Sequence, residues 1–204
     1  MVEWRGDDPS DAMTVPAVVH LLGFPGTGKL TVATAMAEAG ERRGRQVVVV
    51  DNHLTSLPIL SVIGSDGTTN PPPRAWELVH GVRELVHRAA IELVVPDRTL
   101  VFTNFVVVSN PLGADTIDRV RRVATARSST YLPVMLHCDT DELVRRVARP
   151  ERHARRKLID AERALEILGS ETLVRPPELE LEIDVTSTGP AEAATAILDH
   201  LDGG

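Results

Sequence analysis

Residues 23–31 read GFPGTGKLT and carry the clearest indication of the chain's architecture. They follow an apolar run at 17–22 that is typical of a buried strand, and they open a helical pattern at 29–43. In this context the spacing fits the phosphate-loop pattern G-x-x-x-x-G-K. Glycines let a backbone wrap around an anion with its N–H groups pointing inward, and a helix N-terminus adds partial positive charge. The stretch therefore predicts a site for the phosphates of a nucleoside triphosphate, with ATP expected.

The loop supplies most of the predicted nucleotide contacts. Lys29 is expected to reach the β- and γ-phosphates and to take part in catalysis. Leu30 stands where the usual pattern has a Ser or Thr that binds Mg²⁺. A shift of one residue turns a helical side chain by about 100°, so Thr31 is only a weak candidate ligand for the metal. The predicted nucleotide-binding residues of the loop are Gly23, Pro25, Gly26, Thr27, Gly28, Lys29, Leu30 and Thr31.

Short apolar runs alternate with amphipathic stretches along the rest of the chain. The runs predict strands at 17–22, 46–51, 99–105, 131–137 and 181–184. The stretches between and after them predict helices at 29–43, 74–95, 114–127, 141–148, 160–168 and 190–201. This alternation predicts a doubly wound α/β sheet with right-handed crossovers. Residues 53–73 are expected to form a long irregular connection with a functional role.

Composition bounds the class of protein. Hydrophobic residues make up 43% of the 204 residues and aromatic residues only 3%, so one domain with an aliphatic core is expected over residues 15–204. The net charge of −7 disfavours binding to nucleic-acid backbones. Cys138 is the single cysteine, which fits a reducing cytoplasm. The apolar runs are too short to span a bilayer, and residues 1–14 are expected to be a flexible leader.

Residues 23–33 resemble the G-x-P-G-x-G-K-G-T loop of adenylate kinases and related nucleoside monophosphate kinases. Over residues 15–201 the order of elements resembles small P-loop kinases such as shikimate, gluconate and chloramphenicol phosphotransferase-like enzymes. The resemblance implies the three-layer α/β/α fold of P-loop NTPases, with a five-stranded parallel sheet of order 2-3-1-4-5 and an arginine-rich lid. In the adenylate kinases the position of Leu30 also lacks a hydroxyl, and Mg²⁺ is held largely through water.

Asp51 ends the second predicted strand, and ligands of open α/β sheets lie beyond the carboxyl ends of the strands. In the kinases that the chain resembles, an Asp near this position contacts the acceptor hydroxyl, Mg²⁺ or both. Asp51 is therefore predicted to be catalytic, to bind the acceptor and to hold Mg²⁺ through water. The alternative is an Asp that only caps the following turn. His53 and Arg74 are further candidates for binding the acceptor, whereas Trp76 is expected in the core.

The third predicted strand ends in Thr103 and Asn104. P-loop kinases often carry an Asp at this position, which contacts the metal through water. The two residues present here can form hydrogen bonds but bring no charge, so Asn104 is a candidate for binding the acceptor rather than the metal. An ordinary end of a strand is an equal alternative. The loop 184–190, after the last strand, is expected to border the base, to cap the last helix, or both.

Seven cationic residues lie within residues 145–157. Such a run is usually a solvated helix face, but the resemblance places the lid after the fourth strand. Guanidinium groups match phosphate oxygens in two-point contacts. Arg149 and Arg152 are predicted to be catalytic, and Arg145 and Arg156 to bind the nucleotide. Arg127, just before the fourth strand, is a weaker candidate for phosphate.

Three functions remain open from the sequence. The first is an ATP- and Mg²⁺-dependent phosphotransferase acting on a hydroxyl of a small molecule, as a monomer or a homodimer. The second is a nucleoside or nucleotide kinase, which the adenylate-kinase-like loop suggests. The third is a nucleotide-binding regulator or slow NTPase, which Leu30 and the missing acidic residue on the third strand suggest. A deep second pocket beside Asp51 would favour a kinase, and a pocket that ends at the γ-phosphate would favour the regulator.

Overall fold

The computed structural model describes residues 15–66, 69–149 and 158–203. The predicted leader at 1–14 and the lid candidates Arg152 and Arg156 lie outside these ranges. Within them, no helix combines the length and the apolar character that crossing a membrane requires.

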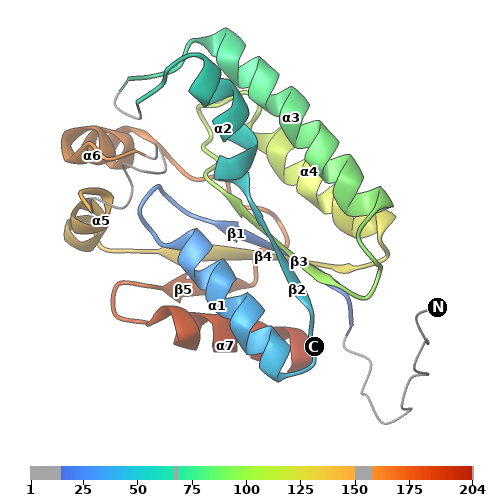
Figure 1. Cartoon of the computed structure of the whole chain (residues 1–204). Coiled ribbons are helices and arrows are strands. Elements are labelled where there is room, and N and C mark those ends of the chain that lie inside the picture. The colour runs from blue at the N-terminus through green and yellow to red at the C-terminus, as the bar shows by residue number, and fades with distance from the viewer. Residues whose placement is uncertain (1–14, 67–68, 150–157, 204) are drawn as a thin grey trace, which may run out of the picture.

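The strands form a five-stranded parallel sheet with the order β2-β3-β1-β4-β5 (Figure 1). This order confirms the fold class that the sequence predicts. The strands lie within one residue of their predicted bounds, because runs of buried apolar residues are a strong signal for central parallel strands. The strands are β1 (Ala17–Leu22), β2 (Val47–Asp51), β3 (Thr99–Asn104), β4 (Thr130–His137) and β5 (Leu181–Asp184).

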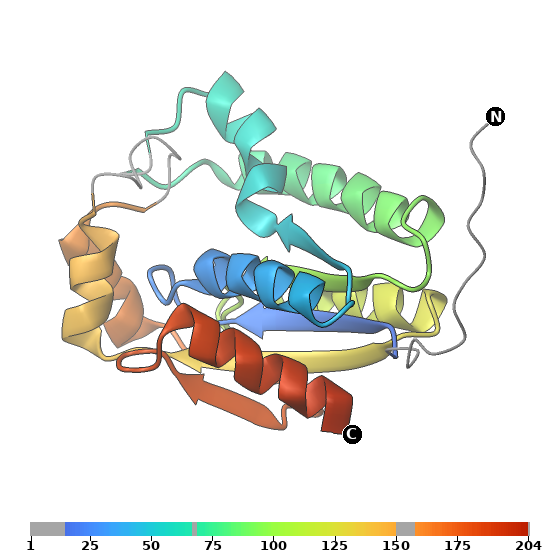
Figure 2. The same ribbon diagram turned by 60° about the horizontal axis from the view of Figure 1, so that its bottom comes forward.

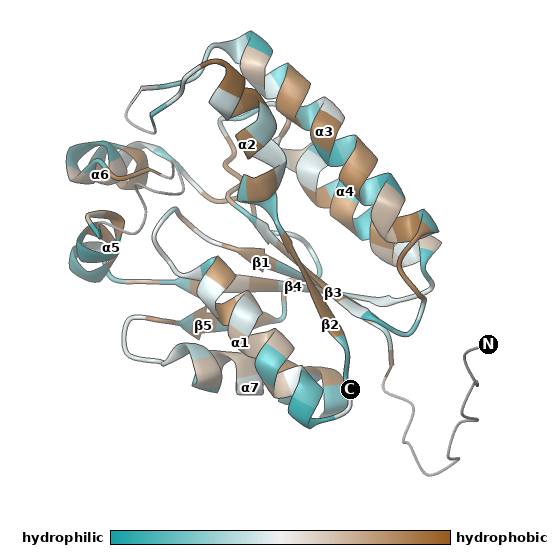
Figure 3. Ribbon diagram, in the orientation of Figure 1, coloured by the Kyte–Doolittle hydropathy of each residue, from teal (hydrophilic) through white to brown (hydrophobic). Residues whose placement is uncertain are grey.

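Helices cover both faces of the sheet and give three layers (Figure 1). Helices α1 and α7 pack together on one face, where Met36 and Ile197 belong to the same buried cluster. Helices α3 and α4 cover the other face, where Ala90 and Val123 share a second cluster. Figure 3 shows the central strands as largely apolar, whereas apolar and polar residues alternate along the helices. The helices are α1 (Lys29–Arg42), α2 (Asn52–Val62), α3 (Pro73–Glu92), α4 (Gly113–Ala126), α5 (Thr140–Val147), α6 (Ala161–Ser170) and α7 (Pro190–Gly203).

The register of the sheet brings the carboxyl ends of its central strands to one edge. Leu22 of β1 pairs with Asn104 of β3, and Asp51 of β2 pairs with Thr103. The phosphate loop follows Leu22 directly, so the loop and the Asp51 carboxylate start from the same edge of the sheet. Helices α5 and α6 and the chain after α2 gather at this edge (Figures 1 and 2).

The segment after β2 begins with a helix, and the prediction of an irregular connection over residues 53–73 is wrong for its first half. Helix α2 starts at Asn52, and its N-cap Asp51 accepts a hydrogen bond from the backbone N–H of His53 at 3.1 Å. Pro58 lies inside this helix. Proline lacks the N–H that an interior helical residue donates, so it usually marks a helix end. For this reason the sequence pattern around Pro58 does not indicate a helix.

Arg127 is a buried structural residue, so the prediction that it contacts phosphate is wrong. Its side chain is 8% exposed and donates hydrogen bonds to the carbonyl oxygens of Ala90 (2.7 Å), Val94 (2.8 Å) and Val95 (2.9 Å). These carbonyls belong to the last turn of α3 and the residues that follow it. A cation at a helix C-terminus satisfies carbonyls that have no partner within the helix. Arg127 therefore ties the end of α3 to the end of α4.

We expect Arg127→Met to lower the free energy of unfolding by about 2 kcal/mol, because several carbonyls lose a charged donor. Urea denaturation measures this change. Arg122→Met on the same helix is the control: its side chain is 62% exposed, and the change should be within about 0.5 kcal/mol. Equal effects of the two substitutions would contradict the capping role of Arg127.

Candidate functional site

A cavity of about 670 Å³ lies at the carboxyl edge of the sheet. The phosphate loop forms its floor, α2 and the first half of α3 form one wall, and residues of α5 and α6 form the other. Figure 2 shows α2 and α3 on one side of this edge and α5 and α6 on the other. The cavity therefore collects side chains from segments that are far apart in the sequence.

The phosphate loop adopts a backbone shape that requires glycine. Gly26 and Gly28 have φ values of 101° and 89°, which residues with a Cβ rarely adopt. A Cβ on Gly26 would lie 2.9 Å from Cγ2 of Val147 and 3.1 Å from Cγ of Leu143. The loop thus packs directly on α5, and the glycine is needed for this close approach as well as for the turn.

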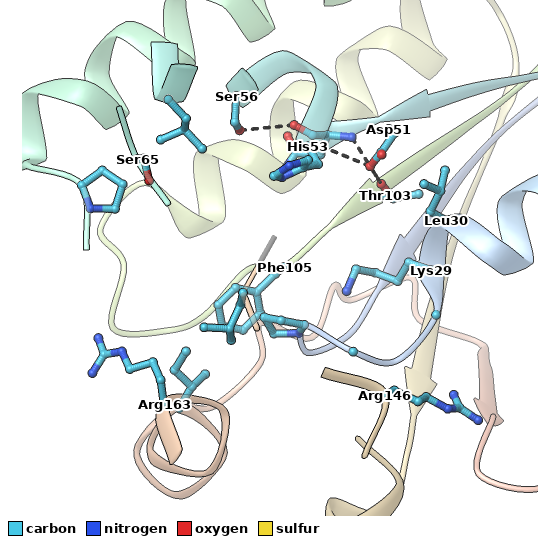
Figure 4. Close-up of a pocket in the computed structure, with 18 of the residues that line it drawn as sticks. Lys29, Leu30, Asp51, His53, Ser56, Ser65, Thr103, Phe105, Arg146 and Arg163 are labelled. Atoms are coloured by element: carbon cyan, nitrogen blue, oxygen red, sulfur yellow. Dashed lines mark hydrogen bonds between the residues drawn. The ribbon is translucent and has the colours of Figure 1, made fainter. Parts of the chain in front are cut away.

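Lys29 is held over the loop by the loop itself. Its Nζ donates hydrogen bonds to the carbonyl oxygens of Gly23 at 2.7 Å and Phe24 at 2.8 Å. The side chain also lines the cavity (Figure 4). An ammonium group in this position can exchange carbonyl oxygens for the oxygens of a phosphate. Leu30 and Thr31, at the start of α1, line the same cavity.

Asp51 lies on the cavity wall at the end of β2 and is only 7% exposed. Its Oδ1 accepts hydrogen bonds from the Thr103 hydroxyl and from the His53 backbone N–H, both at 3.1 Å (Figure 4). The Thr103 oxygen in turn accepts the backbone N–H of Asn52 at 3.2 Å. Asp51 therefore caps α2, as the alternative interpretation expects, and it also lines the cavity; its role in catalysis stays a prediction. His53 also lines the cavity, as predicted for an acceptor site.

Asn104 does not line the cavity and is 5% exposed. Its Oδ1 accepts a hydrogen bond from Nε2 of the buried His20 at 3.0 Å, and the Tyr131 hydroxyl donates to Nδ1 of His20 at 3.0 Å. Burial lowers the pKa of His20 to about 3, so the imidazole is neutral at ordinary pH. The geometry gives Asn104 a role in fixing the end of β3 and does not support its predicted contact with the acceptor.

Of the predicted lid arginines within the described ranges, Arg149 lines the cavity and Arg145 does not. Arg145 is 73% exposed and pairs with Glu142. Arg146, which the sequence interpretation passed over, lines the cavity instead. It donates to the carbonyl oxygens of Thr27 at 3.4 Å and Val185 at 2.7 Å. The helical period of α5 could have indicated this, because Leu143 and Val147 are buried and place Arg146 on the side of the loop.

Two residues of α3 differ from their predicted roles. Arg74 is 76% exposed, pairs with Glu77 and does not belong to the cavity lining. Trp76 lines the cavity and is 38% exposed, so the prediction that it lies in the core is wrong. The wall made by α3 thus offers an aromatic ring to the cavity, and it places Arg74 outside.

The loop after β5 lies beside a second, smaller hollow. Thr186 lines this hollow of about 380 Å³ together with Asp139 and Arg145. The backbone N–H of Thr186 donates to the Asp184 carboxylate at 2.8 Å, and the Thr186 hydroxyl accepts from the N–H of Asp139 at 2.8 Å. The loop is therefore fixed at the carboxyl ends of β4 and β5, and its contact with a base stays a prediction.

The cavity has an excess of positive charge. Among the described residues that line it, Asp51 is the only carboxylate. The cationic side chains on the same walls are Lys29, Arg83, Arg146, Arg149 and Arg163. Glu142 and Glu166 neutralise Arg146 and Arg163, at 2.5 Å each, but from outside the cavity lining. Such a cavity suits a polyanion.

No family model matches the sequence, and no curated protein matches it either. Solved structures match over almost the whole chain. A gluconokinase from Sinorhizobium meliloti is 17% identical over 93% of this chain and 93% of its own, with a TM-score of 0.62. An APS kinase from Mycobacterium tuberculosis, in complex with AMPPNP and APS, is 18% identical over 92% of this chain and 98% of its own, with a TM-score of 0.60.

A shikimate kinase from Acinetobacter baumannii, in complex with shikimate, is 20% identical over 96% of this chain and 98% of its own, with a TM-score of 0.55. At identities this low the likeness establishes the fold and nothing finer. The chain has the fold of the small P-loop kinases, which confirms the resemblance seen in residues 23–33 and in the order of elements.

We expect His20 to make the protein sensitive to acid. Its pKa of about 3 in the folded state lies below the ordinary value of 6.5, so the unfolded state binds the proton first as the pH falls. Stability contributed by the neutral imidazole is complete above pH 6.5 and is lost progressively toward pH 3. Between pH 7.5 and pH 5 the loss from this one residue should be about 2 kcal/mol.

Urea denaturation of the protein and of His20→Gln at both pH values isolates the contribution of His20. Carboxylates and other histidines affect the two proteins alike, so their effects cancel in the comparison. The free energy of unfolding of His20→Gln should fall less on acidification. Equal falls would contradict a buried neutral histidine.

Proposed function

We propose that the protein is an ATP-dependent phosphotransferase that transfers the γ-phosphate to a hydroxyl of a small molecule. The observation that carries this proposal is the extent of the cavity. Beyond Lys29 it continues past Asp51 along Ser56 and Leu60 of α2 to Trp76 of α3. A site that held only a nucleotide would not need this second compartment beside the carboxylate.

The loop and the neighbouring arginines would bind the triphosphate. Backbone N–H groups at the start of α1 lack partners within the helix and would donate to an anion placed on the loop. Lys29 would exchange its bonds to the carbonyls of Gly23 and Phe24 for bonds to phosphate oxygens. Arg146 lies against the loop through Thr27, and Arg149 lines the same wall. These cations would stabilise the charge on the transferred group and exclude water from it.

Asp51 would orient the acceptor hydroxyl and accept its proton. It lines the same cavity as the loop, and its hydrogen bonds from Thr103 and His53 fix one carboxylate oxygen in place. A fixed carboxylate loses little freedom when it takes up the proton in the transition state. The Thr103 hydroxyl thus serves as a positioning group for Asp51.

The residues present fit Mg²⁺ held mostly through water and phosphate. Mg²⁺ commonly keeps several waters and takes one or two carboxylates together with substrate phosphates. Within the described ranges no three His, Cys, Asp or Glu side chains gather in a way that could hold a metal ion. The Asp51 carboxylate is the acidic group on the cavity wall, and Thr31 offers a hydroxyl at the start of α1. When bound, Mg²⁺ would neutralise charge on the β- and γ-phosphates.

A regulator or slow NTPase is the alternative. Leu30 in place of a metal-binding hydroxyl supports it, and so does the absence of an acidic residue at the end of β3.

A nucleoside or nucleotide kinase is a further alternative. The exposed ring of Trp76 in the acceptor half of the cavity supports a nucleoside or nucleotide acceptor, because a base can stack on such a ring. The experiments below separate these possibilities.

We expect Asp51→Asn to reduce phosphoryl transfer about 10²- to 10⁴-fold, because the amide cannot accept the proton of the hydroxyl. Binding of AMPPNP without Mg²⁺ should change little, since the groups proposed to contact the phosphates directly are the loop, Lys29 and the arginines. The measurement follows label from γ-labelled ATP into a fractionated metabolite extract in the presence of Mg²⁺. Lys29→Ala should abolish both binding and transfer.

Asp97→Asn is the matched control for charge, because Asp97 is exposed and precedes β3 at the opposite edge of the sheet. It should transfer label at the rate of the unaltered protein. If ATP binds and label moves only to water, the phosphotransferase proposal is wrong, and the regulator or slow NTPase takes its place.

We expect Arg146→Met to weaken AMPPNP binding roughly tenfold or more, because it removes a charged donor beside the loop. Arg145→Met, one residue away, should weaken it less than threefold or so, since an exposed charge outside the cavity contributes little. Fluorescence titration with a labelled ATP analogue measures both. A larger effect of Arg145→Met would restore the role that the sequence assigns to it.

A further inference from the structure

Arg83 lies on the α3 wall of the cavity, in the half that the triphosphate would not fill. It is half-buried, and its guanidinium reaches across to α2. Its Nε donates to the Thr55 hydroxyl at 3.3 Å and its Nη2 donates to the Ser56 hydroxyl at 3.3 Å. The two hydroxyls are neutral, so they orient the guanidinium without neutralising it.

Arg83 has no carboxylate partner among the residues that the structure describes, unlike its neighbours on the same helix. Arg74 pairs with Glu77, and Arg88 pairs with Glu92. Glu84, adjacent to Arg83 in the sequence, turns outward and pairs with Arg119. Burial without a compensating carboxylate lowers the pKa of Arg83 to about 10, which still leaves it charged at neutral pH. A half-buried charge of this kind is costly unless an anion offsets it.

The position of Arg83 matches one end of a small acceptor. Its partner Ser56 lies five residues after Asp51, so the Cα atoms of the two residues are about 7.5 Å apart along the axis of α2. Ser56, His53 and Asp51 line the cavity together with Arg83. The cations proposed for the phosphate site include Lys29 at the start of α1 and Arg146 of α5, and Figure 4 shows both away from Ser56.

We propose that Arg83 is the anion subsite of the acceptor pocket. The acceptor is then a small hydroxylated anion whose carboxylate, phosphate or sulfate group binds Arg83 while a hydroxyl lies at Asp51. This inference rests on the proposed phosphotransferase function for its hydroxyl end, but the anion subsite can be tested without any transfer. Arginine can make two-point contacts to each of these oxyanions. Arg83 therefore indicates that the acceptor carries a negative charge, and the experiment below distinguishes a carboxylate from a phosphate.

The first test measures binding with the phosphate loop blocked. Protein saturated with AMPPNP and Mg²⁺ is titrated calorimetrically with matched sets of probes: glycerol, glycerate and glycerol 3-phosphate, then glucose, gluconate and glucose 6-phosphate. At least one anion should bind roughly tenfold to a hundredfold more tightly than its neutral parent, as expected for a charged hydrogen bond. The carboxylate and phosphate arms show which oxyanion the subsite prefers.

Two variants of α3 make this test specific. Arg83→Gln should abolish the preference for the anion, and Arg88→Gln should keep it, because Arg88 is 62% exposed and pairs with Glu92. Thr55→Val removes a hydroxyl that orients Arg83 but leaves the charge, so it reports on packing between α2 and α3. If Arg88→Gln loses the preference as fully as Arg83→Gln does, the preference does not depend on the arginine in the cavity and the proposal is wrong.

Transfer of label from γ-labelled ATP to the same probes separates the two proposals. Arg83-dependent binding of an anion without transfer would retain the anion subsite and overturn the phosphotransferase function. Transfer to neutral probes at the rate of the anionic ones would retain the phosphotransferase and overturn the anion subsite. Failure of every anion to bind more tightly than its neutral parent would also overturn the subsite.

Discussion

Asp51 and Thr103 are register partners in neighbouring parallel strands, and the hydrogen bond between their side chains joins the end of β2 to the end of β3. The same register places the phosphate loop, which follows β1, at the same edge of the sheet. A change of register by one residue would reverse the side of the sheet on which each side chain lies. The position of a carboxylate next to an anion-binding loop thus follows from the buried, aliphatic pairing of β1, β2 and β3.

Charge in the cavity is distributed so that one wall would hold the triphosphate and the other the acceptor. Lys29 and Arg146 are held by carbonyl oxygens of the loop and of the β5 end, which are neutral partners that an anion can replace or supplement. Arg83 is held by two hydroxyls. For Arg83 the protein thus fixes the direction of a cation, and no carboxylate of the described residues neutralises it. Preorganisation of this kind reduces the entropy lost when a charged ligand binds.

The sequence predicts the sheet closely because its strands are short runs dominated by apolar residues, and it predicts the loop because the glycine spacing is restrictive. It fails where tertiary packing overrides a local rule. Pro58 conceals α2, which is stabilised by its cap and by packing on α3 rather than by propensity. Arg145 and Arg146 are indistinguishable by composition, and only the buried face of α5 separates them. Arg83 belongs to no sequence motif. Only the folded structure shows that it lines the cavity and has no carboxylate partner among the described residues.

Arg127 shows that a cationic residue next to a strand need not bind a ligand. In the folded chain its side chain caps the carbonyl oxygens at the end of α3. Trp76 shows the reverse, because a large aromatic residue that composition assigns to the core faces the cavity. The chain holds two tryptophans, and the other, Trp4, lies outside the described residues. After Trp4→Phe, all indole emission would arise from the cavity wall. Trp76 would therefore be an intrinsic optical reporter of whether this part of the cavity is filled, with no label attached.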